Sequence, residues 1–193
     1  FDGAHVLGLI GGGKFQDPLR EGATVLIGST HKSLFGPQGG LIVADKEHGE
    51  IIQKKIFPAL IDNAHWNRIA ALTLALAEMK EIGKAYAKQV IKNAQALAKA
   101  LADFDFPVAC PHRGFTKSHQ VILDYGDYKK GRVVARKLEK ANIITDCGVR
   151  LGTGELTRRG MKEKEMQQVA EFIKMVINED EKPAKVKLKV TKF

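Results

Sequence analysis

A short apolar run bounded by a polar loop constrains the fold of this chain more than any other feature. Residues 24–28 read Thr-Val-Leu-Ile-Gly, and a second apolar run, residues 41–44, follows a polar loop over residues 29–40 that contains glycine and proline. Short continuous apolar runs of this kind are typical of strands buried on both faces. Two such strands around a polar loop predict an α/β sheet.

The rest of the chain is predicted to be mainly helical. Apolar residues recur at helical spacing from Asn67 to Ile82, and a second helical segment follows Gly83 and continues to about Asp103. Beyond it the pattern predicts an α+β unit, with strands at 120–124 and 142–145 and helices at 132–140 and 163–177. Lysine alternates with valine or leucine over residues 185–190, which leaves two alternatives, a lysine-protected edge strand and a frayed tail.

The net charge is concentrated at the end of the chain. The 193 residues include 31 Lys and Arg against 22 Asp and Glu, a formal charge of +9. Five of these charges come from lysines that follow the last acidic residue, namely Lys182, Lys185, Lys187, Lys189 and Lys192. The charge left over the body is too diffuse to indicate a nucleic-acid groove, so binding to nucleic acid is not expected.

The composition also bears on location. Cys110 and Cys147 are too few and too far apart for a disulfide framework, and two unclustered thiols suit a reducing, cytoplasmic setting. No apolar run reaches the roughly 18 residues of a transmembrane helix, so we expect no membrane association. The chain starts at Phe1 without the pattern of a signal peptide, which predicts that it begins inside a longer protein.

Residues with useful chemistry lie at two places where a strand would end. Asp2 and His5 lie in the string Asp-Gly-Ala-His near the start, and His31 and Lys32 come just after the run at 24–28. In a parallel sheet both segments would open at the same edge, where ligands of open α/β sheets bind. Taken singly these residues are weak evidence, because an aspartate at a strand end is commonly a turn former and a lysine is commonly solvated.

Taken together, three strings resemble the serine hydroxymethyltransferase (glycine hydroxymethyltransferase) family. The strings are DGAHVLGLI at residues 2–10, STHKSLFGPQGG at 29–40, and GVRLGT at 148–153 with LTRRG at 156–160. The likeness covers nearly the whole chain but only the second half of a family member. It implies a pyridoxal-phosphate enzyme of the aspartate-aminotransferase-like fold (fold type I). Residues 1–83 would be the C-terminal part of its large cofactor-binding domain. Residues 84–193 would be its small α+β C-terminal domain, with a basic tail from about residue 182.

The likeness implies catalytic roles for Lys32, Asp2 and His5 and a substrate-binding role for Arg150. Lys32 matches the lysine that forms a Schiff base with the cofactor aldehyde. Asp2 matches the carboxylate that keeps the pyridine nitrogen protonated, so that the ring can accept electrons. Arg150 matches the arginine that grips the α-carboxylate of the substrate, a task that suits the two-pronged guanidinium group.

Three further residues are implied to lie at the cofactor. His5 and His31 match histidines beside the cofactor ring, and His5 would help to position it. Thr30 would place its hydroxyl near the cofactor phosphate. No metal site is expected.

The implied reaction is the reversible interconversion of serine and glycine, a step of glycine and amino-acid biosynthesis. The one-carbon unit would pass to a reduced pterin of the tetrahydrofolate or tetrahydromethanopterin type, in a homodimer. Two segments depart from the family pattern. Residues 58–65 lack paired glycines that reach a cofactor phosphate, and residues 143–149 are shorter than the loop that helps to hold the pterin. Both departures fit a divergent, archaeal branch.

Two alternatives stay open. The first is a pterin-independent aldolase or lyase of the same fold that acts on 3-hydroxy amino acids, which the short segment at 143–149 favours. The second is a basic binding module that uses the lysine-rich tail. Because the first half of a family member is missing from the sequence, we expect the chain to be inactive alone. An unpaired sheet edge would also make it prone to aggregate or dependent on a complementing partner.

Overall fold

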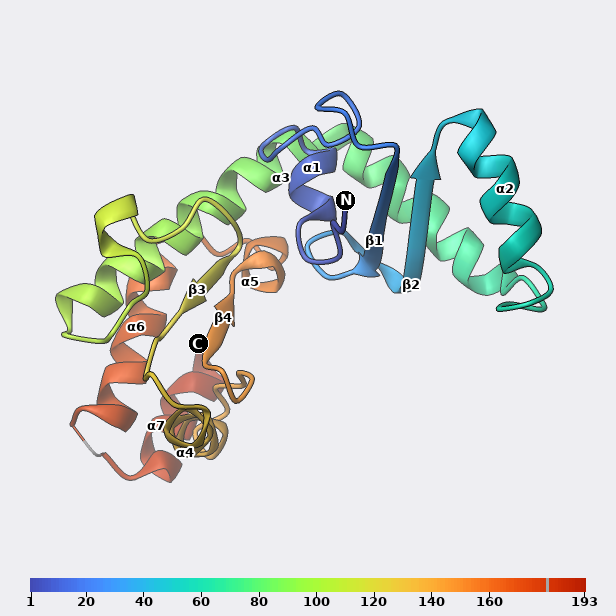
Figure 1. Cartoon of the computed structure of the whole chain (residues 1–193). Coiled ribbons are helices and arrows are strands. Elements are labelled where there is room, and N and C mark those ends of the chain that lie inside the picture. The colour runs from blue at the N-terminus through green and yellow to red at the C-terminus, as the bar shows by residue number, and fades with distance from the viewer. Residues whose placement is uncertain (180) are drawn as a thin grey trace. The chain divides into compact units, whose positions relative to one another are not determined.

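The computed structural model describes residues 1–179 and 181–193, which divide into two compact units, Phe1–Lys88 and Gln89–Phe193. One helix, α3 (Trp66–Asp103), belongs to both and continues through Gly83 without a break (Figure 1). Two separate helical segments were predicted here. Glycine costs about 1 kcal/mol in a helix relative to alanine, but the Ala- and Lys-rich flanks favour helix strongly enough to carry it. Within the described residues, no helix is long and apolar enough to span a membrane.

The first unit contains a β-hairpin. Strands β1 (Val25–His31) and β2 (Phe35–Ala44) pair in antiparallel register with one irregularity near the turn (Figure 1). The polar loop predicted over residues 29–40 is therefore wrong, because only three residues separate the strands. Gly36 permits the pairing, since a Cβ there would lie 2.7 Å from the Thr30 carbonyl oxygen. The first half of β2 contains glycines in place of the apolar side chains that indicate a strand. The hydrophobic pattern therefore does not predict this part of β2.

The described residues cover one face of the hairpin and leave the other face exposed. Leu26 is buried, whereas Ile27 and its cross-strand partner Ile42 are 42% and 43% exposed. The prediction that the run at 24–28 is buried on both faces is therefore wrong. The covered face receives α1 (Leu7–Gly11), and Gly28 lets the Leu7 side chain approach the strand backbone closely.

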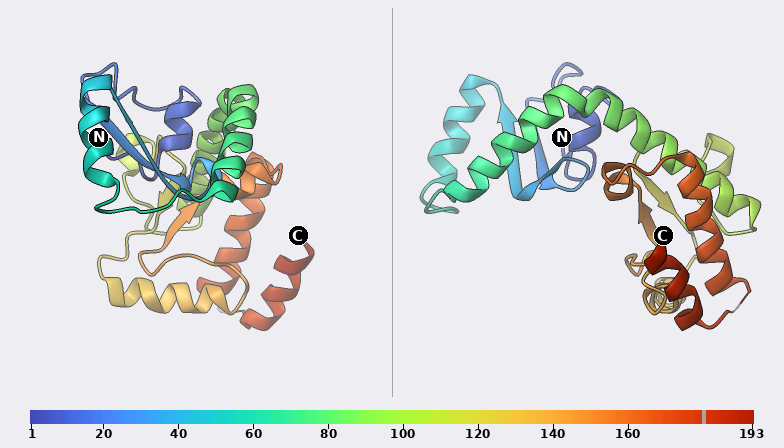
Figure 2. Two further views of the ribbon diagram at one scale, coloured as in Figure 1. Left: turned by 90° about the vertical axis from the view of Figure 1, so that its right-hand side faces the viewer. Right: turned by 180° about the vertical axis from the view of Figure 1, so that it is seen from behind.

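Helices complete the first unit. In the views of Figure 2, α1 lies alongside α3, and the turn after α1 contacts α3 where a Cβ on Gly12 would meet Ala87 at 2.5 Å. Helix α2 (Lys46–Ile56) follows β2 and begins at Asp45, whose carboxylate accepts the N–H of His48 at 2.9 Å. An aspartate in this position satisfies a backbone donor that the helix itself leaves unpaired.

The second unit joins a small sheet to helices. Its elements after α3 are a 3-10 turn (Pro111–Arg113), β3 (Gln120–Ile122), α4 (Tyr128–Glu139), β4 (Arg150–Gly152), α5 (Gly154–Arg158), α6 (Glu163–Ile177) and α7 (Pro183–Lys192). The strands β3 and β4 are antiparallel. The predictions of a strand at 120–124 and of helices at 132–140 and 163–177 are confirmed, although β3 is shorter and α4 begins earlier. Asp127 explains the early start of α4, because its carboxylate accepts the N–H of Lys129 at 2.8 Å.

The predicted strand at 142–145 is wrong. Asn142 has a φ of 63°, in the left-handed region that ends a helix and not in the extended region of a strand. The strand that pairs with β3 is β4, which begins eight residues later in the chain at Arg150.

The basic tail is a helix, so both alternatives for residues 185–190 are wrong. Pro183 stands in the first turn of α7, where its missing N–H has no cost. Val186 is completely buried, whereas Leu188 is 66% exposed. In a strand these two residues would share a face, but in a helix they point in different directions. Glu181 lies 3.4 Å from the amine of Lys185 and forms a second, longer pair with Lys189.

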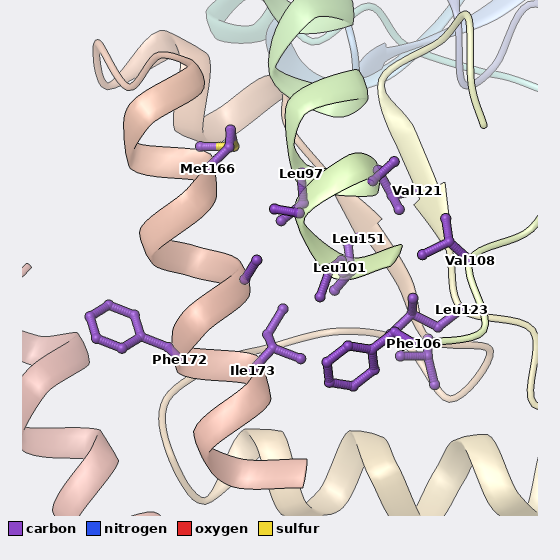
Figure 3. Close-up of a cluster of buried hydrophobic side chains, with 14 of the residues drawn as sticks. Leu97, Leu101, Phe106, Val108, Val121, Leu123, Leu151, Met166, Phe172 and Ile173 are labelled. Atoms are coloured by element: carbon purple, nitrogen blue, oxygen red, sulfur yellow. The ribbon is translucent and has the colours of Figure 1, made fainter. Parts of the chain in front are cut away.

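A contiguous apolar core holds the second unit together. Figure 3 shows side chains from α3, the β3–β4 sheet and α6 converging on one another. Leu97 and Leu101 come from α3, Val121 from β3, and Met166 and Ile173 from α6, and each is at most 1% exposed. Burying such side chains stabilises a fold by roughly 1.5–3 kcal/mol each. This core fixes the position of β4, which carries Arg150.

Candidate cofactor and substrate site

The first residues of the chain run parallel to β1 and place Asp2 beside it. Asp2 forms a parallel bridge with Ile27, and Gly3 donates its N–H to the Ile27 carbonyl at 2.7 Å. The Oδ1 atom of Asp2 accepts the N–H of Ala4 at 2.9 Å, which orients the carboxylate. Within residues 1–179 and 181–193, the second carboxylate oxygen has no hydrogen-bond partner.

Lys32 lies in the hairpin turn, directly after β1, and its side chain is exposed. In the part of the chain that the structure describes, its amine takes part in no hydrogen bond or ion pair. The next two residues, Ser33 and Leu34, are only 1% and 2% exposed. The turn is therefore anchored in the interior by its backbone and by its neighbours, while the amine stays available to a ligand.

Four residues to which the sequence motifs assign no role hold this turn in place, namely Gly8, Ser33, Phe35 and Tyr86. The Ser33 hydroxyl accepts the N–H of Gly8 in α1 at 3.0 Å, and the Tyr86 hydroxyl of α3 donates to the Ser33 carbonyl at 3.1 Å. The Tyr86 ring also meets the edge of Phe35, with the ring centroids 5.0 Å apart. A Cβ on Gly8 would overlap the Ser33 carbonyl, so this position requires glycine. The only signal in the sequence is that Gly8 interrupts an apolar run.

Thr30 and His31 close the hairpin on the other side of Lys32. Thr30 is almost completely buried and donates its hydroxyl proton to the Pro37 carbonyl at 2.6 Å. The Nδ1 atom of His31 accepts the N–H of Gly39 at 3.1 Å, and this bond requires the tautomer with its proton on Nε2. Because a hydroxyl has a single proton, donation from Thr30 to a phosphate would require the bond to Pro37 to break.

The first unit thus contains five of the six predicted site residues. Thr30, His31 and Lys32 lie at the end of β1, Asp2 lies on the segment parallel to it, and His5 is exposed in the turn before α1. An exposed primary amine can attack an aldehyde, and a carboxylate with a free oxygen can pair with a protonated ring nitrogen. The donor set therefore fits pyridoxal phosphate.

Arg150, the sixth predicted site residue, belongs to the second unit and begins β4. Its Nε donates to Oδ2 of Asp146 at 2.5 Å, and its Nη2 pairs with the same oxygen. The other oxygen of Asp146 accepts the backbone N–H of Arg150 at 3.0 Å. Partial burial alone would raise the pKa of Asp146, but hydrogen bonds from the Arg150 backbone and guanidinium, together with its charge, outweigh burial and lower this pKa.

The residue before Arg150 has a strained backbone. Val149 has a φ of 50°, a region that β-branched residues rarely adopt, and its side chain is completely buried in the core. Its N–H donates to the Asp146 carbonyl at 3.0 Å, and its own carbonyl accepts the N–H of Leu123 at 3.1 Å. Residues 146–149 therefore form a closed turn that leads into β4.

Comparison with known proteins agrees with the motifs. The family model of serine hydroxymethyltransferase matches residues 1–173. The chain is 50% identical to the serine hydroxymethyltransferases of Methanocella arvoryzae and Methanocaldococcus jannaschii, and each match covers 100% of the chain and 49% of the relative. The corresponding protein of Nitrosopumilus maritimus is 49% identical, with 48% of its length covered. The chain thus spans about half the length of the curated relatives that it matches, and these relatives are archaeal.

A solved structure confirms the predicted fold class. The L-threonine transaldolase of Pseudomonas fluorescens superposes with a TM-score of 0.93 at 34% sequence identity. The match covers 99% of this chain and 47% of the transaldolase chain. The predicted fold type I α/β architecture is therefore present in this chain.

Proposed function

Because the chain belongs to the serine hydroxymethyltransferase family, we propose that it carries the cofactor-attachment part of a pyridoxal-phosphate enzyme that interconverts serine and glycine. The observation that carries this proposal is the exposed amine of Lys32, which makes no hydrogen bond or ion pair within the described residues and directly follows β1, the strand that pairs with the Asp2 segment. Hydrogen bonds from Gly8 and Tyr86 to Ser33 fix the backbone of the turn. Binding of a ligand at the Lys32 amine would therefore cost little backbone conformational entropy.

Each residue of the first unit has a distinct task in this proposal. Lys32 would hold the cofactor covalently through its amine. The free oxygen of Asp2 would keep a proton on the ring nitrogen, and His5 and His31 would lie beside the ring. When bound, pyridoxal phosphate supplies an electron sink for a carbanion at the substrate Cα. Thr30 would hold the two strands of the hairpin together through its hydrogen bond to the Pro37 carbonyl. The family resemblance also implies a contact between its hydroxyl and the cofactor phosphate.

Arg150 would bind the α-carboxylate of the amino-acid substrate. Its guanidinium offers parallel N–H donors that match a carboxylate in both charge and shape. The one-carbon acceptor would be a reduced pterin of the tetrahydrofolate or tetrahydromethanopterin type. We further propose a homodimer in the cytoplasm that serves glycine biosynthesis, on the strength of the family alone.

The proposal is tested by locating the cofactor on the complete enzyme that contains this chain. The enzyme is loaded with pyridoxal phosphate, reduced with borohydride, digested and mapped by mass spectrometry. We expect the cofactor on Lys32, and no label in Lys32→Arg. The variant Lys14→Arg, which changes another lysine of the same unit, should label like the wild type. A label that persists in Lys32→Arg would refute the assignment.

A second function, a pterin-independent aldolase or transaldolase acting on 3-hydroxy amino acids, is favoured by two observations. The segment at 143–149 is short, and the solved structure that matches the chain is named an L-threonine transaldolase. Serine turnover measured with and without a tetrahydropterin separates the two functions. Strict dependence on the pterin supports the hydroxymethyltransferase, and turnover without it supports the aldolase.

A further inference from the structure

We propose that Asp146 is a positioning residue for Arg150, which orients the guanidinium before the substrate carboxylate binds. This inference rests on the function proposed above, because it assumes that Arg150 receives that carboxylate. The sequence motifs give Asp146 no role, since it stands in the segment where the chain departs from the family pattern.

Asp146 and its neighbour hold Arg150 at several points. The two carboxylate oxygens of Asp146 accept different hydrogen bonds from Arg150. Oδ1 accepts the backbone N–H, and Oδ2 accepts from the guanidinium. The hydroxyl of Thr145 donates to the Arg150 carbonyl at 2.9 Å. Both the main chain and the side chain of Arg150 are therefore fixed by residues that lie four and five positions before it.

The contacts leave one end of the guanidinium for a ligand. Asp146 occupies the edge formed by Nε and Nη2. Across the described ranges, nothing bonds to Nη1, and the Arg150 side chain is 45% exposed. A carboxylate can therefore approach the end formed by Nη1 and the second Nη2 proton, where two parallel N–H groups point outward.

The geometry favours positioning over competition with the substrate. Asp146 cannot swing away from Arg150 as a free surface carboxylate would, because Oδ1 is tied to the backbone and the Asp146 carbonyl closes the turn to Val149. An exposed arginine loses much rotamer freedom when it binds a ligand. The pair with Asp146 imposes that ordering in the folded chain, ahead of binding.

The first test measures glycine binding by calorimetry on the complete, pyridoxal-phosphate-loaded enzyme. We expect Asp146→Ala to weaken the affinity roughly 10- to 100-fold, because a misplaced binding group loses much of its effect. Asp146→Asn should fall between Asp146→Ala and the wild type, since its single oxygen can serve only one of the two contacts. In steady-state assays with serine, KM should rise more than kcat falls.

The matched control is Asp103→Ala. It removes an exposed aspartate of the same unit, which pairs with Lys99 at 2.8 Å and at the same four-residue spacing. Its glycine affinity should equal that of the wild type. If Asp146→Ala proves unfolded by circular dichroism, the affinity of Asp146→Asn decides the question.

A second readout needs no cofactor. In the full chain, NMR detects the Nε–H of Arg150, assigned by its loss in Arg150→Lys. We expect this proton to exchange slowly in the wild type and in Asp103→Ala, and rapidly in Asp146→Ala. Glycine affinity in Asp146→Ala that equals or exceeds the wild-type value overturns the positioning role. A wild-type enzyme that binds no glycine at all would instead refute the proposed function, and this inference with it.

Discussion

The hydroxyl of Tyr86 donates to the carbonyl of Ser33, 53 positions earlier in the chain, and so a helix fixes the backbone next to Lys32. The contact is buried, and it supports the turn between β1 and β2. The exposed Lys32 side chain is thus carried by a backbone that buried contacts hold in place. This arrangement makes the turn sensitive to substitutions that never touch the amine.

We expect Tyr86→Phe to lower the free energy of unfolding by about 1 kcal/mol, because the buried Ser33 carbonyl loses a donor. The ring contact with Phe35 survives in this variant, so the effect isolates the hydroxyl. Urea denaturation measures the change. The control is Tyr128→Phe, which alters a tyrosine that is 66% exposed and should change stability little. Equal effects in the two variants would contradict the structure.

Two glycines of α1 give opposite expectations. In Gly8→Ala the added methyl group meets the backbone of Ser33 and Leu34, which cannot yield easily, so we expect a loss of about 1–3 kcal/mol. In Gly11→Ala the methyl group meets only the Met79 side chain at 3.6 Å, an ordinary contact. That variant should be neutral or slightly more stable, because alanine favours a helix. Thermal denaturation of both variants distinguishes them, and a stable Gly8→Ala would show that α1 lies elsewhere.

The helical tail predicts unequal costs at two neighbouring apolar positions. Val186→Ala should destabilise the chain by about 2 kcal/mol, because it removes two buried methyl groups. Leu188→Ala should change stability by less than about 0.5 kcal/mol, because Leu188 is largely exposed. In an edge strand the two residues would share a face and the costs would be similar. Chemical denaturation of the pair therefore tests the helix directly.

The Asp146–Arg150 pair makes stability depend on pH in the acid range. Because the pKa of Asp146 is lowered below its ordinary value of 3.8 in the folded chain, the unfolded chain binds this proton more readily. The stabilisation is complete above that ordinary value and is lost as the pH falls through the lowered pKa. We expect Asp146→Asn to show a shallower decline of unfolding free energy below about pH 4 than the wild type. Parallel declines measured by urea denaturation would argue against the pair.

The elements that the sequence predicts correctly are those with a clear amphipathic period. Helix α6 matches its predicted range of 163–177 because its buried residues recur at helical spacing and the opposite face is polar. The hairpin was missed because the first half of β2 reads Phe-Gly-Pro-Gln-Gly-Gly, in which Gly36 allows close backbone approach and adds no apolar side chain to the pattern. The helix in the tail was not predicted, because lysine alternates with apolar residues at the two-residue period of a strand. The structure shows helix α7 there, with Val186 buried.

The candidate site shows the same division. Sequence motifs predict Asp2 and Lys32 as site residues, because the residue types and their neighbours match the family motifs. Ser33 and Tyr86 could not be found in this way, because their roles arise only when α3 packs beside the hairpin. Asp146 is close to Arg150 in the sequence, yet the pair depends on the left-handed backbone of Val149, which no pattern of residue types indicates.

Val149 combines a backbone conformation that favours glycine with a side chain that the core needs. Its backbone conformation suits glycine, but glycine would leave a hole where the valine side chain now fills the core. In Val149→Gly, the backbone strain would be relieved, but the cavity left in the core would offset the gain in stability. A larger residue at this position would still be strained by the positive φ. The bend that aims Arg150 is consequently difficult to mutate in either direction, and a replacement of the whole turn has better prospects than a single change.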